Sequence, residues 1–72
     1  MKEKIINLIA DTLQVERSLI TEKTQVEDIP EWDSLMHIMI IGALEEIGVS
    51  IPLEEAIELS GVADILKKAG LE

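Results

Sequence analysis

The residues whose side chains are best suited to take part in a reaction lie near the middle of the chain, where Asp33 and Ser34 are followed by His37. His37 stands three residues after Ser34 and four after Asp33, so a helix would place all three side chains on one face. A carboxylate, an imidazole and a hydroxyl are the groups of a serine hydrolase triad. Groups on two adjacent helical turns rarely reach the geometry of a triad, however, and no oxyanion donors are evident beside them. We therefore do not expect a hydrolase.

Asp33 and Ser34 also have a purely structural interpretation. Asp and Ser are favoured at helix starts, where their side chains accept hydrogen bonds from free backbone N–H groups. Pro30 stands shortly before them and an aliphatic run follows, as at many helix starts. The tripeptide Asp-Ser-Leu at residues 33–35 favours this capping role when it is taken alone, so any functional role depends on the surrounding elements.

The elements around Asp33 and Ser34 are predicted by the spacing of apolar residues. Residues 2–14 are expected to form a helix, because one helical face collects Ile5, Ile6, Leu8, Ile9 and Leu13. A second helix is predicted to open at Asp33 and Ser34 and to run to about Ile47, with Gly48 as its C-terminal glycine. A short helix is predicted over residues 53–59 and a last helix over residues 62–69, separated by Ser60 and Gly61.

Residues 15–33 are polar and lack a sustained period, so they are predicted to form a long connection. Loops of this length are uncommon in small domains and tend to be functional. Scattered apolar residues are expected to pin the loop to the helices: Val15, Leu19, Ile20, Val26 and Ile29. The predicted fold is therefore all-α, a small four-helix bundle of three longer helices and one short helix, with a long loop between the first and second helices.

Length and charge exclude several classes of protein. The chain has 72 residues, which we expect to form a single domain over residues 1–72. Its 15 acidic and 6 basic residues give a net charge of −9, which argues against a nucleic-acid partner. The chain has no Cys and a single His, so neither disulfides nor a metal site is expected. Acidic proteins of this size suit basic protein surfaces.

Hydropathy indicates a folded chain that does not insert into a membrane. Hydrophobic residues make up 47% of the chain, more than a disordered acidic chain carries. The longest apolar stretch, residues 38–44, is too short to span a bilayer, and residues 1–11 do not resemble a signal peptide. We expect a soluble, cytoplasmic monomer.

Several short motifs, in this order and spacing, resemble the acyl carrier protein family over essentially the whole chain. They are Val-Glu-Asp-Ile at residues 26–29, Asp-Ser-Leu at 33–35, Ala-Leu-Glu-Glu at 43–46, Ile-Pro at 51–52 and Glu-Glu-Ala at 54–56. The resemblance implies a freestanding carrier, not an enzyme. It further implies that Ser34 is esterified with 4′-phosphopantetheine from coenzyme A by a phosphopantetheinyl transferase. The thiol of this arm would then carry acyl or aminoacyl groups between enzymes of a biosynthetic pathway.

The resemblance also assigns roles to the neighbours of Ser34. Asp33 is expected to cap the helix and help the transferase recognise the site, and Leu35 to anchor the helix start. His37 is expected to be partly exposed near the phosphate of the arm. From the residues themselves, we expect partner enzymes to dock at the start of this helix and nearby acids, on Trp32, Met36, Met39, Glu54 and Glu55. A pocket for the cargo is expected to be lined by Leu44, Ile51, Ala56, Leu59 and Ile65.

Three departures from the family pattern stand out. Met36 and Met39 occupy positions where carriers usually have acidic residues; this indicates either partners with a more apolar docking surface or local packing. Trp32 replaces a small residue and either packs on the loop or faces partners. Gly42 either allows a close helix contact or leaves space for an acyl chain. The apolar helix suggests a specialised carrier of secondary metabolism, polysaccharide or aminoacyl pathways, not of fatty-acid synthesis. The alternative function is an unmodified acidic adaptor that binds a basic protein.

The net charge of −9 generates a prediction about stability. Like charges repel across so small a surface, and added ions screen that repulsion. We expect the melting temperature, followed by circular dichroism, to rise as salt is raised from low to moderate ionic strength, or as a divalent cation is added. A melting temperature that stays flat over this range would contradict the prediction.

Overall fold

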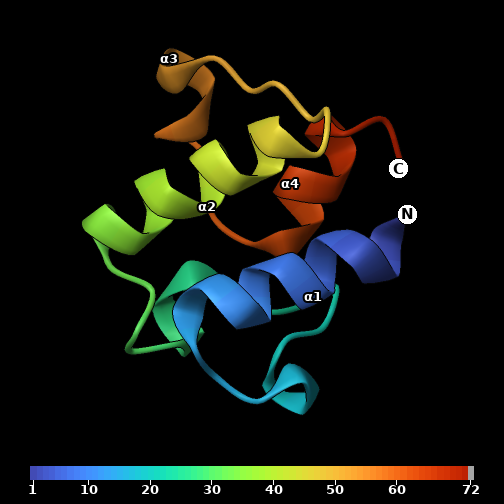
Figure 1. Ribbon diagram of the computed structural model, residues 1–72. Coiled ribbons are helices and arrows are strands. Elements are labelled where there is room, and N and C mark those ends of the chain that lie inside the picture. The colour runs from blue at the N-terminus through green and yellow to red at the C-terminus, as the bar shows by residue number, and fades with distance from the viewer. Residues whose placement is uncertain (72) are drawn as a thin grey trace.

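The chain folds into four α-helices within residues 1–71, the part that the computed structural model describes (Figure 1). The helices are α1 (Lys2–Leu13), α2 (Ser34–Glu46), α3 (Leu53–Ala56) and α4 (Val62–Lys68). Two short 3-10 helices, η1 (Arg17–Leu19) and η2 (Val26–Asp28), lie in the connection between α1 and α2. This arrangement confirms the predicted all-α bundle with one short helix and a long first loop. None of the helices in this part of the chain is long and apolar enough to cross a membrane.

Aliphatic side chains from α1, α2 and α4 form one core. The predicted face of α1 is buried at Ile5, Ile6, Ile9 and Leu13, while Leu8 is only partly covered. The side chains with essentially no exposure come from these three helices and the first loop: Ile5, Ile9, Ile20, Ile40, Leu44, Val62, Ile65 and Leu66. Burial of each such side chain contributes roughly 1.5–3 kcal/mol, which is how so short a chain without cysteines can hold a fold.

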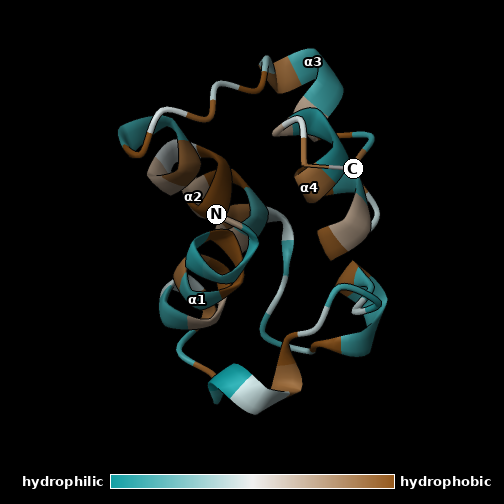
Figure 2. Ribbon diagram, turned by 90° about the vertical axis from the view of Figure 1, so that its right-hand side faces the viewer, coloured by the Kyte–Doolittle hydropathy of each residue, from teal (hydrophilic) through white to brown (hydrophobic). Residues whose placement is uncertain are grey.

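Helix α2 is apolar on nearly every side, unlike the amphipathic α1. Figure 2 shows α2 brown along most of its length, whereas α1 has teal and brown sides. One stripe of α2 is buried in the core, at His37, Ile40 and Leu44, and Met36 and Ile41 beside it are partly buried. Other apolar side chains of α2 are therefore left at the surface, and Leu35 and Met39 are 67% and 52% exposed. The first half of the helix offers solvent an apolar face with no acidic residue on it.

The long connection is ordered and anchored at both of its 3-10 helices. Ile20 and Ile29 are buried, as predicted, and Val15 and Val26 are partly buried against the core. The prediction for Leu19 is wrong, because its side chain is 55% exposed. Leu19 ends η1, whose tight turn directs the following residue, Ile20, into the core instead.

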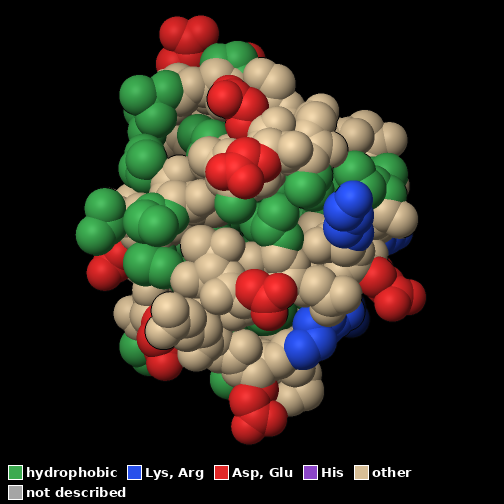
Figure 3. Space-filling model, in the orientation of Figure 1, with side chains coloured by type: hydrophobic (Ala, Val, Ile, Leu, Met, Phe, Trp, Pro, Cys, Tyr) green, Lys and Arg blue, Asp and Glu red, His purple; other side chains and the backbone are tan. Residues whose placement is uncertain are grey.

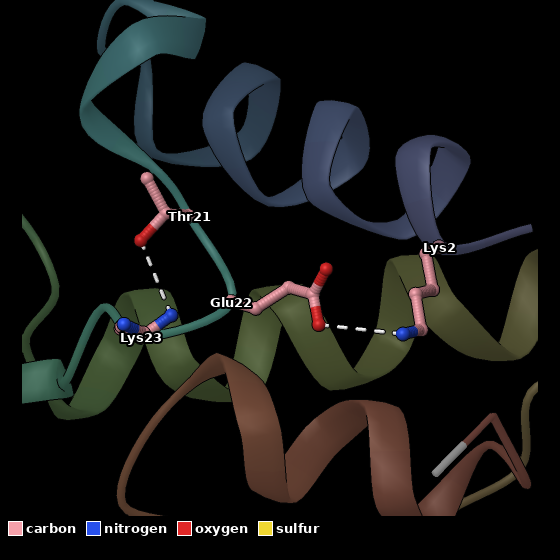
Figure 4. A network of polar contacts seen from close by, with 4 residues as sticks. All are labelled: Lys2, Thr21, Glu22 and Lys23. Atoms are coloured by element: carbon pink, nitrogen blue, oxygen red, sulfur yellow. Dashed lines mark hydrogen bonds and ion pairs between the residues drawn. The ribbon is translucent and has the colours of Figure 1, made fainter.

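Polar contacts tie the same connection to α1. Lys2 forms an ion pair with Glu22 at 3.3 Å, and the Thr21 hydroxyl accepts a hydrogen bond from the backbone N–H of Lys23 at 3.1 Å (Figure 4). Arg17 donates to the Asn7 side chain of α1 at 2.6 Å. The contacts from Lys2 and Arg17 join the loop to the outside of α1, whereas the bond between Thr21 and Lys23 lies within the loop.

Helix α3 is shorter than predicted, ending at Ala56 and not at Leu59. The chain leaves the helix because it must become extended at Ser60 and Gly61 to pair with the first loop. The backbone N–H of Val26 donates to Ser60 O at 2.8 Å, and that of Val62 donates to Thr24 O at 2.9 Å. In Figures 1 and 2, α3 stands at the top of the molecule.

Asp64 closes the turn that leads into α4. Its carboxylate accepts hydrogen bonds from the Ser60 backbone N–H at 2.9 Å and from the Ser60 hydroxyl at 2.8 Å. These bonds lower the pKa of the Asp64 carboxyl, with smaller contributions from Lys67 and Lys68. Asp64 therefore stays ionised at neutral pH and continues to hold the start of α4.

Two glycines lie in opposite surroundings and generate a paired prediction. A Cβ on Gly61 would lie 2.6 Å from Thr24 O, so Gly61→Ala should lower the free energy of unfolding by about 1–3 kcal/mol. Gly42 is exposed on α2, and a Cβ there would meet no atom within 4 Å. Neither a close helix contact nor space for an acyl chain therefore explains Gly42, and Gly42→Ala should raise the free energy of unfolding by about 0.5–1 kcal/mol.

Urea denaturation of both variants beside the wild type measures these changes. The close approach of the chain at Gly61 is contradicted if Gly61→Ala is as stable as the wild type.

Candidate functional site

Ser34 lies exposed at the first turn of α2, where Asp33 fixes the start of the helix. Asp33 is the N-cap residue, as predicted, and its carboxylate accepts a hydrogen bond from the backbone N–H of Met36 at 2.8 Å. The Asp33 carbonyl accepts from the N–H of His37 at 2.9 Å. These two bonds hold Ser34 in one place while leaving its side chain accessible to solvent.

The position of Ser34 favours a negatively charged substituent. Helix α2 has 13 residues, and its first N–H groups have no intrahelical carbonyl to bond. These N–H groups and the helix dipole make the N-terminal end of a helix partly positive. A phosphate on the Ser34 hydroxyl would therefore lie beside the end of α2 that accepts anions best.

An open pocket of about 450 Å³ adjoins Ser34. Its walls come from three parts of the chain: the first loop, the beginning of α2 and the segment after α3. The lining residues are Val26, Trp32, Asp33, Ser34, His37, Ile38, Ile57 and Leu59. Apart from Asp33, Ser34 and the ring of His37, every one of these side chains is apolar or aromatic, so the pocket suits an apolar group attached near Ser34.

Two of the lining residues, Trp32 and His37, are buried and contact each other. Trp32 is 3% exposed and His37 is 9% exposed, and their rings lie 6.0 Å apart between centroids. The Trp32 indole Nε1–H donates a hydrogen bond to His37 Nδ1 at 2.9 Å. His37 Nε2 lies 2.7 Å from the carbonyl oxygen of Ala56, the last residue of α3.

These contacts correct two expectations. His37 is not a partly exposed neighbour of a phosphate, because it belongs to the stripe of α2 that faces the core. Trp32 packs inside the protein, as one of its two interpretations held, so its buried side chain does not offer a docking surface to a partner. Aromatic rings with a polar atom are often buried in this way when a hydrogen-bond partner is available.

The geometry also disfavours a hydrolase triad. In the His37 ring, Nδ1 bonds to Trp32 and Nε2 bonds to the carbonyl oxygen of Ala56. The Asp33 carboxylate accepts a bond from the backbone N–H of Met36. None of the hydrogen bonds of His37 within residues 1–71 goes to Ser34 or to the Asp33 carboxylate. His37 is therefore not placed to take a proton from the Ser34 hydroxyl.

The residues expected to line a cargo pocket are mostly part of the closed core. Of the five, only Leu59 lines the pocket beside Ser34. The other four are buried in the core cluster and do not line that pocket: Leu44, Ile51, Ala56 and Ile65. Val26, Ile38 and Ile57 line the pocket although none of them was predicted to do so. Ile38 was detectable, because it stands four residues after Ser34 and so shares its helix face.

Exposed apolar side chains lie on α2 and near α3, and two of them, Ile38 and Ile57, line the pocket. Leu35 and Met39 on α2, and Leu53 and Ile57 at α3, have large exposed fractions. Figure 3 shows hydrophobic side chains gathered over the beginning of α2 and below α3, at the left, with Lys and Arg on the right. Exposed apolar side chains that gather on one face are typical of a surface that meets a partner.

The other residues predicted to dock partners differ in their exposure and in their contacts within the chain. Met36 is partly buried against the core, whereas Glu54 is exposed. Glu55 pairs with Lys68 of α4 at 2.6 Å, and this hydrogen bond raises the pKa of the Lys68 ammonium. Glu55 is therefore already engaged with a base of its own chain.

Comparison with curated proteins finds significant similarity to several proteins named acyl carrier protein. Those of Rickettsia massiliae and Rickettsia felis are each 33% identical to this chain over 69 residues, which cover 93% of this chain and 79% of theirs. That of Rickettsia prowazekii is 32% identical over the same coverage. No family model matches the chain, and no solved structure matches it significantly.

The cap at Asp33 generates a prediction that separates its shape from its charge. Asp33→Ala removes the acceptor of the Met36 N–H and should lower the free energy of unfolding by about 0.5–2 kcal/mol. Asp33→Asn keeps an equivalent acceptor and should retain most of the stability. Urea denaturation measures both variants, and equal losses in the two would contradict a capping role.

Proposed function

The chain belongs to the acyl carrier protein family, and on this premise we propose that Ser34 is the residue that bears 4′-phosphopantetheine. The chain is thus a carrier and not an enzyme. The observation that supports Ser34 most strongly is its exposure at the capped start of a 13-residue helix, beside an apolar pocket.

The modification needs no catalytic group from this chain. In the proposed step, the Ser34 Oγ forms a bond to the phosphorus of the phosphopantetheine group, and the pyrophosphate bond of coenzyme A breaks. Adenosine 3′,5′-bisphosphate leaves, and a base of the transferase accepts the hydroxyl proton. The bound arm would supply the thiol that this cysteine-free chain lacks, and thioesters form on that thiol.

The pocket is the proposed resting place of the arm or of its cargo. Val26, Ile38, Ile57 and Leu59 offer apolar contacts directly beside the attachment point. The core beneath is closed, since Leu44 and Ile65 have no exposed surface. This favours a cargo held at the surface near α3 over one threaded between the longer helices.

Partners are proposed to dock on the apolar surface around Ser34. These partners are the phosphopantetheinyl transferase and the cytoplasmic enzymes that load and unload the arm. Leu35, Met36 and Met39 on α2 would supply apolar contacts, and Glu54 would add charge at the edge. Because α2 has no acidic residue before Glu45, binding should depend more on apolar burial than on ion pairs. This supports a specialised carrier over one of fatty-acid synthesis.

Intact mass spectrometry tests the attachment site. The unmodified protein is incubated with a broad-specificity phosphopantetheinyl transferase, magnesium and coenzyme A, alongside Ser34→Ala and Ser18→Ala. Ser18 is an exposed serine in η1, so its substitution controls for the loss of any surface hydroxyl. We expect one phosphopantetheine on the wild type and on Ser18→Ala, and none on Ser34→Ala.

Two other outcomes would change the assignment. Modification of Ser34→Ala would place the arm on another residue. No modification of the wild type, while a control carrier is modified in the same mixture, would speak for the unmodified acidic adaptor.

A further inference from the structure

Trp32, His37 and Ala56 form a buried hydrogen-bond chain that determines which His37 nitrogen carries the proton. An indole Nε1–H can only donate, so His37 Nδ1 must be the acceptor at 2.9 Å. A carbonyl oxygen can only accept, so His37 Nε2 must donate to Ala56 O at 2.7 Å. The ring is therefore neutral in this arrangement, with its proton on Nε2, and both nitrogens are satisfied.

A histidine at this position is unexpected from packing alone. It continues a stripe of α2 whose other members are Ile40 and Leu44, and the surrounding core is otherwise aliphatic except for Trp32. Burying a polar ring is costly unless its atoms are hydrogen-bonded. Unlike an aliphatic contact, these bonds have direction, so they are satisfied only when Trp32 and α3 occupy their observed positions.

Helix α3 has few other attachments. It contains only four residues, Leu53–Ala56, and a helix of this length is unstable by itself. Ala56 is buried, but Leu53 and the adjoining Ile57 are largely exposed. Its ion pair between Glu55 and Lys68 joins two half-exposed side chains, which contributes little. Within residues 1–71, the bond from His37 to Ala56 is the one hydrogen bond that joins α2 to α3.

The hydrogen bonds among Trp32, His37 and Ala56 also join residues on two sides of the pocket beside Ser34. Trp32 and His37 line it from the side of α2, whereas Ile57 and Leu59 line it from the side of α3, directly after Ala56. A bond from His37 to Ala56 therefore links the two walls. Its length and direction determine how far Ile57 stands from the Ser34 end of α2.

We propose that His37 is a positioning residue: by bonding to Trp32 and Ala56 at once, it holds α3 against the start of α2 and sets the width of the pocket beside Ser34. Use of this pocket by the arm or cargo rests on the proposed function. The position of α3 does not, because it belongs to the unmodified chain.

The first test measures amide hydrogen exchange and the single indole N–H resonance of the unmodified protein by NMR. His37→Leu removes both bonds while keeping an apolar side chain of similar length. We expect exchange at residues 53–57 to accelerate by about tenfold relative to α1 and α4, as the loss of one buried hydrogen bond predicts. The indole resonance should move toward that of a solvent-exposed indole.

Rescue and control variants separate positioning from general stability. His37→Gln offers a carbonyl oxygen as the acceptor and an NH2 group as the donor, and it should restore slow exchange in α3. Ile41→Leu, an apolar change on α2 outside the pocket, should leave α3 unaffected. If His37→Leu does not fold, Trp32→Phe provides the same test, because it leaves Nδ1 without its donor and should loosen α3 to a lesser extent.

Uniform acceleration across all helices in His37→Leu, or unchanged exchange at residues 53–57, would overturn the proposal. So would a Trp32→Phe variant with unchanged exchange in α3, where that variant is needed.

A second test uses the protein after modification at Ser34. Contacts between the arm and the Ile57 methyl groups, seen as nuclear Overhauser effects in the wild type, should vanish in His37→Leu and return in His37→Gln. Equal contacts in all three proteins would overturn the role of His37 in shaping the pocket. If the wild type is not modified at all, the proposed function fails, while the exchange experiment still decides the position of α3.

Discussion

The structure depends on the burial of aliphatic side chains from α1, α2 and α4 in one core. A chain of 72 residues can bury only a small core, so apolar side chains of the first loop must be buried in it as well. Ile20 and Ile29 do this, and they bring the loop down along α1 and toward the start of α2. The position of Ser34 follows from this constraint, because the loop that ends at Asp33 is already fixed where α2 begins.

The site combines Ser34, on a long helix, with a side of the pocket that is formed by the short helix α3 and the residues after it. Ser34 stands on a 13-residue helix that packs against α1, whereas α3 has four residues and exposes Leu53 and Ile57. Such a combination suits a carrier, which must present its arm in a constant position and still accommodate different partners. In our proposal, the buried hydrogen bonds of His37 to Trp32 and Ala56 give α3 a preferred position without enlarging the core.

Much of the fold was predictable because it depends on local patterns. The period of apolar residues predicted α1, Asp33 predicted the start of α2, and Gly48, with its positive φ of 92°, follows its end. Errors arose where a distant partner decides the outcome. Helix α3 ends early because the following segment bonds to the first loop, through Ser60 to Val26 and through Val62 to Thr24. Leu19 is exposed because the turn of η1 directs Ile20 inward.

By itself, the sequence determined the three longer helices, the cap at Asp33 and the acidic charge, since each is a matter of residue type and short spacing. It also pointed to Ser34 as the residue that we propose to carry the arm. Only the tertiary structure decided what surrounds that serine. It buried Trp32 and His37 as a bonded pair, and it formed the pocket from Val26, Ile38 and Ile57. The physical reason is that residues far apart in the chain meet only when the helices pack, and that packing is set by the core as a whole.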